Sequence, residues 1–291
     1  MFKRRLIEIF KFQLLFISLL WGGGTLANHN DIEIGLEASN KGDFELAMSI
    51  WLPHAQSGNS LAQFYVGSLY RNGEGVDVDY LEAARWFKLS ADNGEWISQS
   101  NLGQMYYLGQ GVDQSYQNAA YYLELAATQG DPKSQHNLAH MYAKGLGVEK
   151  DINKAEFWYR HAIARDFYPS FTHYGLMLLK GIEVPQNVDE AMKLFETAAE
   201  NNDTLAQILV GMIYVQGEHR DVDYKKGLYW SSVAYANIKK YEQENQAEKR
   251  MLGVMQSITK ASQNLSDEKI REILSKAEDF ISEAPKPLDV M

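Results

Sequence analysis

A period of 36 residues constrains this chain of 291 residues more than any other feature. The period recurs without an insertion or a deletion, and it brings glycines and alanines into aligned columns. One such column contains Gly67, Gly103, Ala139, Gly175 and Gly211, and a second contains Gly73, Gly109, Gly145, Gly181 and Gly217. Self-similarity at a period of about 20–50 residues is the signature of repeat architectures. The unit of folding is therefore a short copy rather than a domain of about 150 residues.

Each copy is predicted to form two helices. In the first copy, Ala62, Val66 and Leu69 form an apolar stripe at helical spacing over residues 60–72. Gly73 follows where a left-handed C-cap is needed, and Asp79 is an N-cap residue for a second helix that ends near residue 93. One pair of helices cannot bury its own apolar face, so the copies must stack. The sequence thus predicts an all-α fold, a right-handed α/α solenoid of two-helix repeats with a C-terminal helical cap.

The periodicity also divides the chain. Residues 28–61 form a degenerate partial copy that caps the N-terminal end, and residues 242–291 form a C-terminal helical cap and tail. The five full copies are expected at residues 62–97, 98–133, 134–169, 170–205 and 206–241.

The tail contains a helix that Ser266 can cap, with Ile270, Ile273 and Ala277 on one face. The favoured interpretation is a cap docked on the fifth copy. The alternative is a helix that lies in the groove of the solenoid.

The N-terminus has the order of a secretory signal peptide. Three basic residues at 3–5 precede an apolar run at 12–21, three glycines and Thr25-Leu26-Ala27. We expect cleavage after Ala27, which predicts a periplasmic or secreted bacterial protein. The alternative is an uncleaved membrane anchor, although Glu8 and Lys11 interrupt the run of about 20 apolar residues that a span requires.

Charge and cysteine content exclude several classes of function. The chain has 28 basic and 38 acidic residues, a net charge of −10, which becomes −13 without residues 1–27. An acidic protein does not suit sequence-independent binding of nucleic acid. Without cysteine, the chain forms no disulfide, thiol nucleophile or cysteine-ligated zinc site.

The repeat motif resembles a known family. Residues 98–112 read SQSNLGQMYYLGQGV and residues 137–155 read NLAHMYAKGLGVEKDINKA, which is similar to the Sel-one-like repeat (SLR) family, a relative of the tetratricopeptide repeat. The resemblance covers roughly residues 40–240. It implies a bacterial adaptor or scaffold that binds proteins and needs no cofactor. Extracytoplasmic relatives often carry one disulfide per repeat, and this sequence has no cysteine to form one.

Motifs for catalysis are weak. Ser257-x-x-Lys260 and Ser266-x-x-Lys269 match the Ser-x-x-Lys of penicillin-recognising enzymes, but neither Ser-Asp-Asn nor Lys-Thr-Gly accompanies them. The alternative function is therefore a periplasmic hydrolase or an enzyme that acts on peptidoglycan or β-lactams. The expected function is non-catalytic protein–protein interaction.

The partner-binding residues are expected on the concave face. By analogy with tetratricopeptide helices, this face takes the third, seventh, tenth and eleventh residue of each copy. His136 and His140 stand one helical turn apart there, but no third ligand accompanies them, so a solvated or partner-facing pair is expected rather than a metal site. The candidate residues are Phe64, Arg71, Tyr107, His136, His140, Lys144, Leu176, Lys180 and Met212.

Charge varies along this expected face. Arg71, Lys144 and Lys180 are basic residues in an acidic protein and suit a partner carboxylate, while Phe64 and Tyr107 offer aromatic anchors. Ordinary solvated lysines and arginines are an equally good interpretation. The C-terminal end of the face is apolar, so a ligand or the tail helix must cover it.

Overall fold

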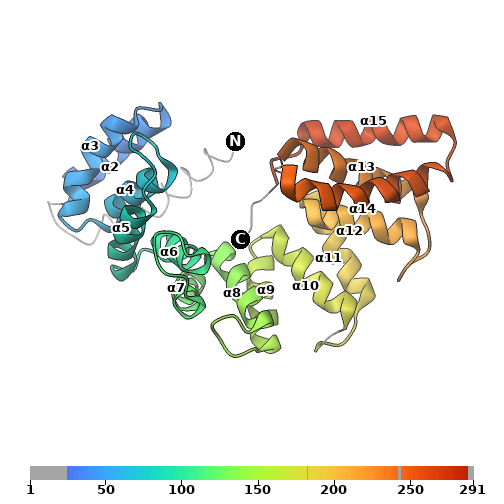
Figure 1. Ribbon diagram of the computed structural model, residues 1–291, viewed down its shortest axis with the longest axis horizontal. Helices are drawn as coiled ribbons and strands as arrows, with labels where there is room; N and C mark the ends of the chain where they lie inside the picture. The colour runs from blue at the N-terminus through green and yellow to red at the C-terminus, as the bar shows by residue number, and fades with distance from the viewer. Residues whose placement is uncertain (1–24, 182, 242–243, 288–291) are drawn as a thin grey trace. The chain divides into compact units, whose positions relative to one another are not determined.

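The computed structural model describes residues 25–181, 183–241 and 244–287 (Figure 1). These residues form 14 helices, α2 to α15, and no strand. The predicted all-α fold with paired helices in each repeat is confirmed. Most of the predicted signal peptide, residues 1–24, lies outside the described residues. None of the helices described is both long enough and apolar enough to cross a membrane.

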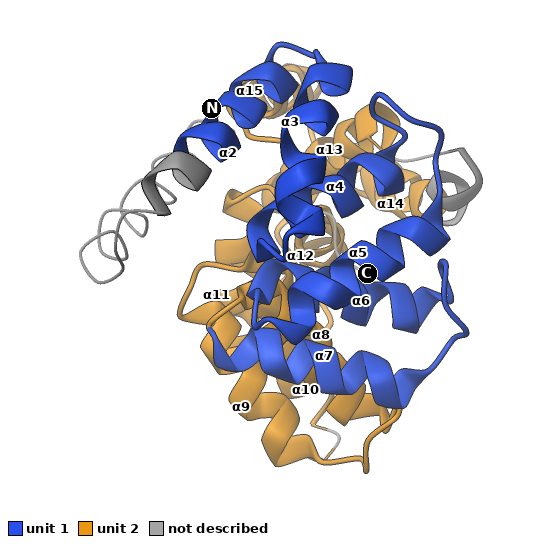
Figure 2. Ribbon diagram, turned by 90° about the vertical axis from the view of Figure 1, so that its left-hand side faces the viewer, with its two compact units in different colours: residues 1–129 blue, residues 130–291 orange. Residues whose placement is uncertain are grey.

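The chain divides into two units, residues 1–129 and 130–291, which are coloured separately in Figure 2. In the first unit, each helix contacts the next along the chain. The degenerate partial copy forms a helical pair, and the next two pairs are copies one and two. The helices are α2 (Thr25–Asn40), α3 (Phe44–Gln56), α4 (Ser60–Asn72), α5 (Tyr80–Asp92), α6 (Trp96–Leu108) and α7 (Tyr116–Thr128).

The second unit contains copies three to five and the C-terminal cap. Its first six helices pair as α8 with α9, α10 with α11, and α12 with α13. The last two belong to the predicted cap. The helices are α8 (Pro132–Lys144), α9 (Ile152–Ile163), α10 (Tyr168–Lys180), α11 (Val188–Glu200), α12 (Thr204–Gln216), α13 (Tyr224–Tyr241), α14 (Glu244–Ser262) and α15 (Asp267–Glu283).

Turn residues set the ends of these helices as the sequence predicts. Gly73 ends α4 in the left-handed conformation, with φ of 69°, and its amide donates to the carbonyl of Leu69. Asp79 begins α5, because its carboxylate accepts hydrogen bonds from the amides of Leu81 and Glu82. In copies four and five the second turn glycine is replaced by Glu183 and His219, which still adopt positive φ values of 67° and 71°.

Small residues let the two helices of a copy approach closely. A Cβ atom added to Gly103 would lie 2.8 Å from Cγ of Leu123 on the paired helix. At Gly211 it would lie 2.9 Å from the backbone nitrogen of Ser231. The glycine column is therefore a packing requirement.

A buried glutamine ties neighbouring copies together. The side-chain amides of Gln63, Gln99 and Gln207 donate to carbonyls eight residues earlier, near the end of the preceding helix, at 3.1, 3.2 and 3.1 Å. Each of these carbonyls also accepts the backbone amide three residues later, so the glutamine supplies it with a second donor. It therefore fixes the position of a first helix on the copy before it.

The C-terminal cap packs on copy five with both of its helices. The helix α14 contacts α12 and α13, while α15 contacts α13. Asn202, buried in the turn between α11 and α12, donates its side-chain amide to the carbonyl of Pro285, which follows α15. The tail is thus held against the array at both ends of α15.

Candidate functional site

The expected partner-binding residues all lie on the first helices of the copies, α4, α6, α8, α10 and α12. We call the side chains of their third, seventh, tenth and eleventh columns the first-helix face, with columns numbered from the first residue of each copy. The seventh column is half-buried in every copy, and the eleventh is exposed in every copy. The eleventh column contains Asn72, Leu108, Lys144, Lys180 and Gln216.

In the first unit, each of the two expected aromatic anchors packs against another aromatic ring. Phe64 is half-buried, with its ring centroid 6.1 Å from that of Phe87 on the paired helix. Tyr107 is also half-buried and meets Tyr116 edge to face at 5.2 Å. Burial raises the pKa of the Tyr107 hydroxyl.

Arg71 in the tenth column has partners within the first unit. Its guanidinium donates to the side-chain oxygen of Asn101 on α6 and lies 5.9 Å from the centre of the Phe87 ring. Burial lowers the pKa of Arg71, and the nearby Glu74 acts against this shift. Arg71 therefore links the first helices of copies one and two, a structural role that the charge pattern did not predict.

In the second unit, the expectation of a solvated or partner-facing histidine pair is wrong for His136. Its side chain is only 3% exposed, and its Nδ1 lies 2.9 Å from Oγ of Ser170. The reason is that Phe167 and Ser170, at the start of the next first helix, cover the third column of copy three. His140 is half-buried. Within the described residues, no three histidine, aspartate or glutamate side chains are arranged to hold a metal ion.

Lys144 and Lys180 are exposed at the last residues of α8 and α10. Neither forms an ion pair with a carboxylate among the described residues, in contrast to Lys150, which pairs with Glu183 at 2.8 Å. Lys144 is close enough to His140 that its charge helps to lower the pKa of that imidazole, although burial contributes most and His173 follows. Both lysines also suit the negative end of the helix dipole.

The apolar end of the first-helix face is covered by the cap. Ile208 is 8% exposed and packs with Ala234, Ile238 and Val254, and the half-buried Met212 joins this cluster from the next turn of α12. Val215 lies in a second cluster with Leu228, Ala261 and Ile273. The helices α14 and α15 thus supply the cover that the sequence required. Leu176 in copy four is half-buried against the main core of the unit.

The hydroxyls of both Ser-x-x-Lys sequences bond to their own helices. Ser257 is buried and donates to the carbonyl of Gly253 at 3.2 Å. Ser266 caps α15, because its Oγ accepts the amide of Lys269 at 3.4 Å. Neither hydroxyl is hydrogen-bonded to a base in the described part of the chain, the arrangement that activates a serine nucleophile.

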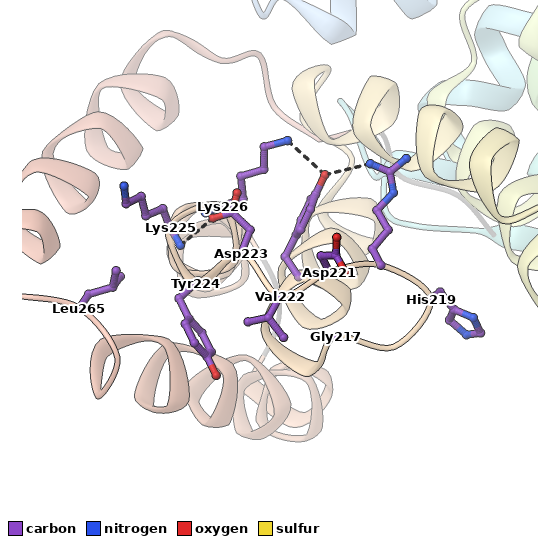
Figure 3. A pocket seen from close by; sticks show the side chains of 11 residues that line it. Gly217, His219, Asp221, Val222, Asp223, Tyr224, Lys225, Lys226 and Leu265 are labelled. Atoms are coloured by element: carbon purple, nitrogen blue, oxygen red, sulfur yellow. Dashed lines mark hydrogen bonds between the residues drawn. The ribbon is translucent and has the colours of Figure 1, made fainter.

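A cleft of about 1040 Å³ lies beside the turn between α12 and α13, away from the first-helix face (Figure 3). Two of its basic side chains, Arg220 and Lys226, have partners. Arg220 pairs with Asp189 at 3.7 Å, and Lys226 donates to the Tyr214 hydroxyl at 3.1 Å. That hydroxyl donates to Glu196 at 2.6 Å. The charges of Arg220 and Lys226 are therefore compensated by carboxylates of the same unit.

Comparison with known proteins identifies the family. The sequence profile described as Sel1 repeat matches residues 60–95, 96–131, 132–167, 172–203 and 204–237. These matches cover more than half of the chain, which therefore belongs to the Sel1 repeat family. No curated protein matches the sequence.

Solved structures of bacterial proteins share the fold. A Sel1 repeat protein from Oxalobacter formigenes is 27% identical, with a TM-score of 0.70 over 85% of this chain and 99% of that one. The protein c5321, described as a protective antigen present in uropathogenic Escherichia coli strains displaying an SLR fold, is 25% identical with a TM-score of 0.64. That match covers 87% of this chain but 60% of c5321.

Proposed function

We propose that this protein is an exported, non-catalytic scaffold of the bacterial envelope that binds a protein partner through its first-helix face. The observation that carries the proposal is the charge of that face. No aspartate or glutamate stands in any of its four columns in any copy, although 38 of the 291 residues are acidic. In copies three and four, the face presents Lys144 and Lys180, exposed and without ion pairs among the described residues.

This arrangement suits an acidic segment of a protein. Lysine ammonium groups attract carboxylates from a distance and bind them in many orientations, which favours fast association. The helices that carry the lysines are held by packing, so the scaffold itself need not become ordered on binding. A membrane contact is expected only if the N-terminal segment remains uncleaved, and nucleic acid is not an expected partner.

The test is a capture experiment from envelope extract with the purified mature chain. We expect Lys144→Glu with Lys180→Glu to abolish retention of the proteins that the wild type captures. The matched control is Lys193→Glu with Lys239→Glu, which reverses two exposed lysines on the second helices α11 and α13. Equal retention by both double variants and the wild type would show that the first-helix face does not bind the partner.

The proposed export and cleavage are tested separately from partner binding. N-terminal sequencing of the protein from the periplasmic fraction should give Asn28 as the first residue. A chain that retains Met1 and sediments with membranes would support the anchored alternative instead.

A further inference from the structure

Three histidines from two neighbouring first helices form a cluster in the second unit. His136 and His140 lie on α8, and His173 lies on α10. The ring centroid of His173 is 4.9 Å from that of His136 and 6.4 Å from that of His140, with the rings nearly perpendicular in both pairs. Each of these side chains is buried or half-buried. The contact between copies three and four therefore includes three imidazole rings.

The groups around His136 favour a neutral imidazole ring. Tyr159 of α9 and Phe167 cover His136, with ring centroids at 5.5 and 5.4 Å. The ring of His173 lies 6.4 Å from that of Tyr159, and its Nδ1 lies 2.9 Å from the carbonyl oxygen of Pro169. The aromatic walls around His136 give an added proton on that ring little compensation.

The charged groups that face the cluster come from three helices. On α8, Lys133 acts on His136 and Lys144 acts on His140, and both charges oppose protonation. From α12, Asp203 interacts with His173. This carboxylate already accepts the Thr172 hydroxyl and the Ala206 amide, both at 2.8 Å, and Arg250 of α14 also acts on it. Asp203 therefore interacts with two hydrogen-bond donors and with Arg250 in addition to His173.

Protonation of the cluster opposes the native contact. Burial holds the pKa of His136 well below its usual range, and the charges of His173 and His140 lower it further. Burial also lowers the pKa of His140, again with a contribution from His173. A histidine with a lowered pKa in the native state binds protons better when its surroundings open. The native contact is therefore fully stable above the ordinary histidine pKa of about 6.5, and it weakens as the pH falls below that value.

We propose that His136, His140 and His173 form an acid-sensitive joint, so that mild acid separates α8 from α10 before copy five and the cap open. The contacts of copy five with α14 and α15 contain no histidine among the described side chains of their two apolar clusters. Acid should therefore act on one contact within the second unit and leave the other in place. The joint does not depend on the identity of any partner.

Hydrogen exchange followed by mass spectrometry on the full mature chain tests the joint. Exchange is compared at about pH 7.5 and about pH 5, after correction for the intrinsic rate of each pH. We expect peptides of α8 and α10 to lose roughly tenfold or more of their protection at the lower pH, because each linked proton changes an equilibrium about tenfold per pH unit. Peptides of α12 and α13 should change much less.

Two single variants separate protonation from packing. His136→Asn keeps a side-chain amide that can hydrogen-bond with Ser170 but cannot take up a proton, so the acid-induced loss of protection should be much smaller than in the wild type. His161→Asn is the control, because His161 is exposed on α9 and lies outside the cluster. The joint is disproved if α8 and α10 remain as protected at about pH 5 as at about pH 7.5. It is also disproved if His136→Asn and the wild type lose the same protection.

Discussion

Copy five and the two copies before it use the same columns for different purposes. In copy five the third, seventh and tenth columns are Ile208, Met212 and Val215, and α14 and α15 cover them. In copies three and four, the same face ends in the exposed Lys144 and Lys180. Both regions have the same backbone pattern of two helices per copy.

The difference shows that the repeat determines the scaffold and leaves the face free to vary. Where the chain supplies its own covering helix, the face is apolar, and its burial stabilises the terminal copy. Where no described helix covers the face, it ends in exposed lysines, which suit the proposed acidic partner. Substitutions that make the covered apolar face polar, or remove a basic residue from the rest of the first-helix face, test this difference.

The largest loss of stability is expected from a substitution that disrupts the packing of α14 on copy five. Val254 of α14 is 1% exposed and packs against Ile208 and Ile238. In Val254→Asp, a carboxylate without a partner would be buried there, which should lower the free energy of unfolding by about 3 kcal/mol. Chemical denaturation measures the loss.

A matched control lies on the same helix. Met255 is 51% exposed on the outer side of α14. Met255→Asp should change the free energy of unfolding by less than about 0.5 kcal/mol. If both variants are equally stable, α14 does not cover copy five.

An intermediate effect is expected from exchanging a covered residue for its counterpart in copy four. Thr172 occupies the third column of copy four and donates to Asp203 at 2.8 Å. In Ile208→Thr, the hydroxyl would face the apolar side chains of α14, and a buried ethyl group would be lost. The variant should cost about 1 to 3 kcal/mol in urea denaturation.

Ile208→Val controls for the loss of volume alone. It removes one methylene group without adding a hydroxyl, so it should cost about 1 kcal/mol. A threonine variant that is no less stable than the valine variant would mean that the third column of copy five is not an apolar contact.

The smallest effect concerns the basic residues of the face. Arg71→Met keeps an apolar chain near Phe87 but removes the donor to Asn101, which should cost about 1 to 2 kcal/mol. Lys144→Met removes an exposed charge without an ion pair among the described residues, so stability should change by less than about 0.5 kcal/mol. Thermal melting of the two variants side by side measures this contrast, and equal melting temperatures would contradict the structural role of Arg71.

Sequence reasoning succeeded where one copy contains all the information. The first helix predicted over residues 60–72 is observed as Ser60–Asn72, because its apolar stripe and the glycine after it are local signals. The same holds for the cap at Asp79 and the left-handed glycines. On the first-helix face, Lys144 and Lys180 are exposed, and their role in binding stays a prediction.

Sequence reasoning failed where neighbouring copies decide the environment of a side chain. His136 is buried because Phe167 and Ser170 of the following copy reach its column. Arg71 is occupied because Asn101 of the next first helix lies within reach. No spacing within one copy reveals either contact, since both depend on the residue that occupies another column of another copy.

The sequence by itself determined the period, the helical pairs and the absence of cysteine chemistry, because these depend on local patterns and composition. Only the tertiary structure decided that α14 covers copy five, that Arg71 joins two copies, and that three histidines from α8 and α10 meet. The physical reason is that a repeat specifies how each copy packs on its neighbour, while burial and charge at one position depend on side chains that the stacking brings together.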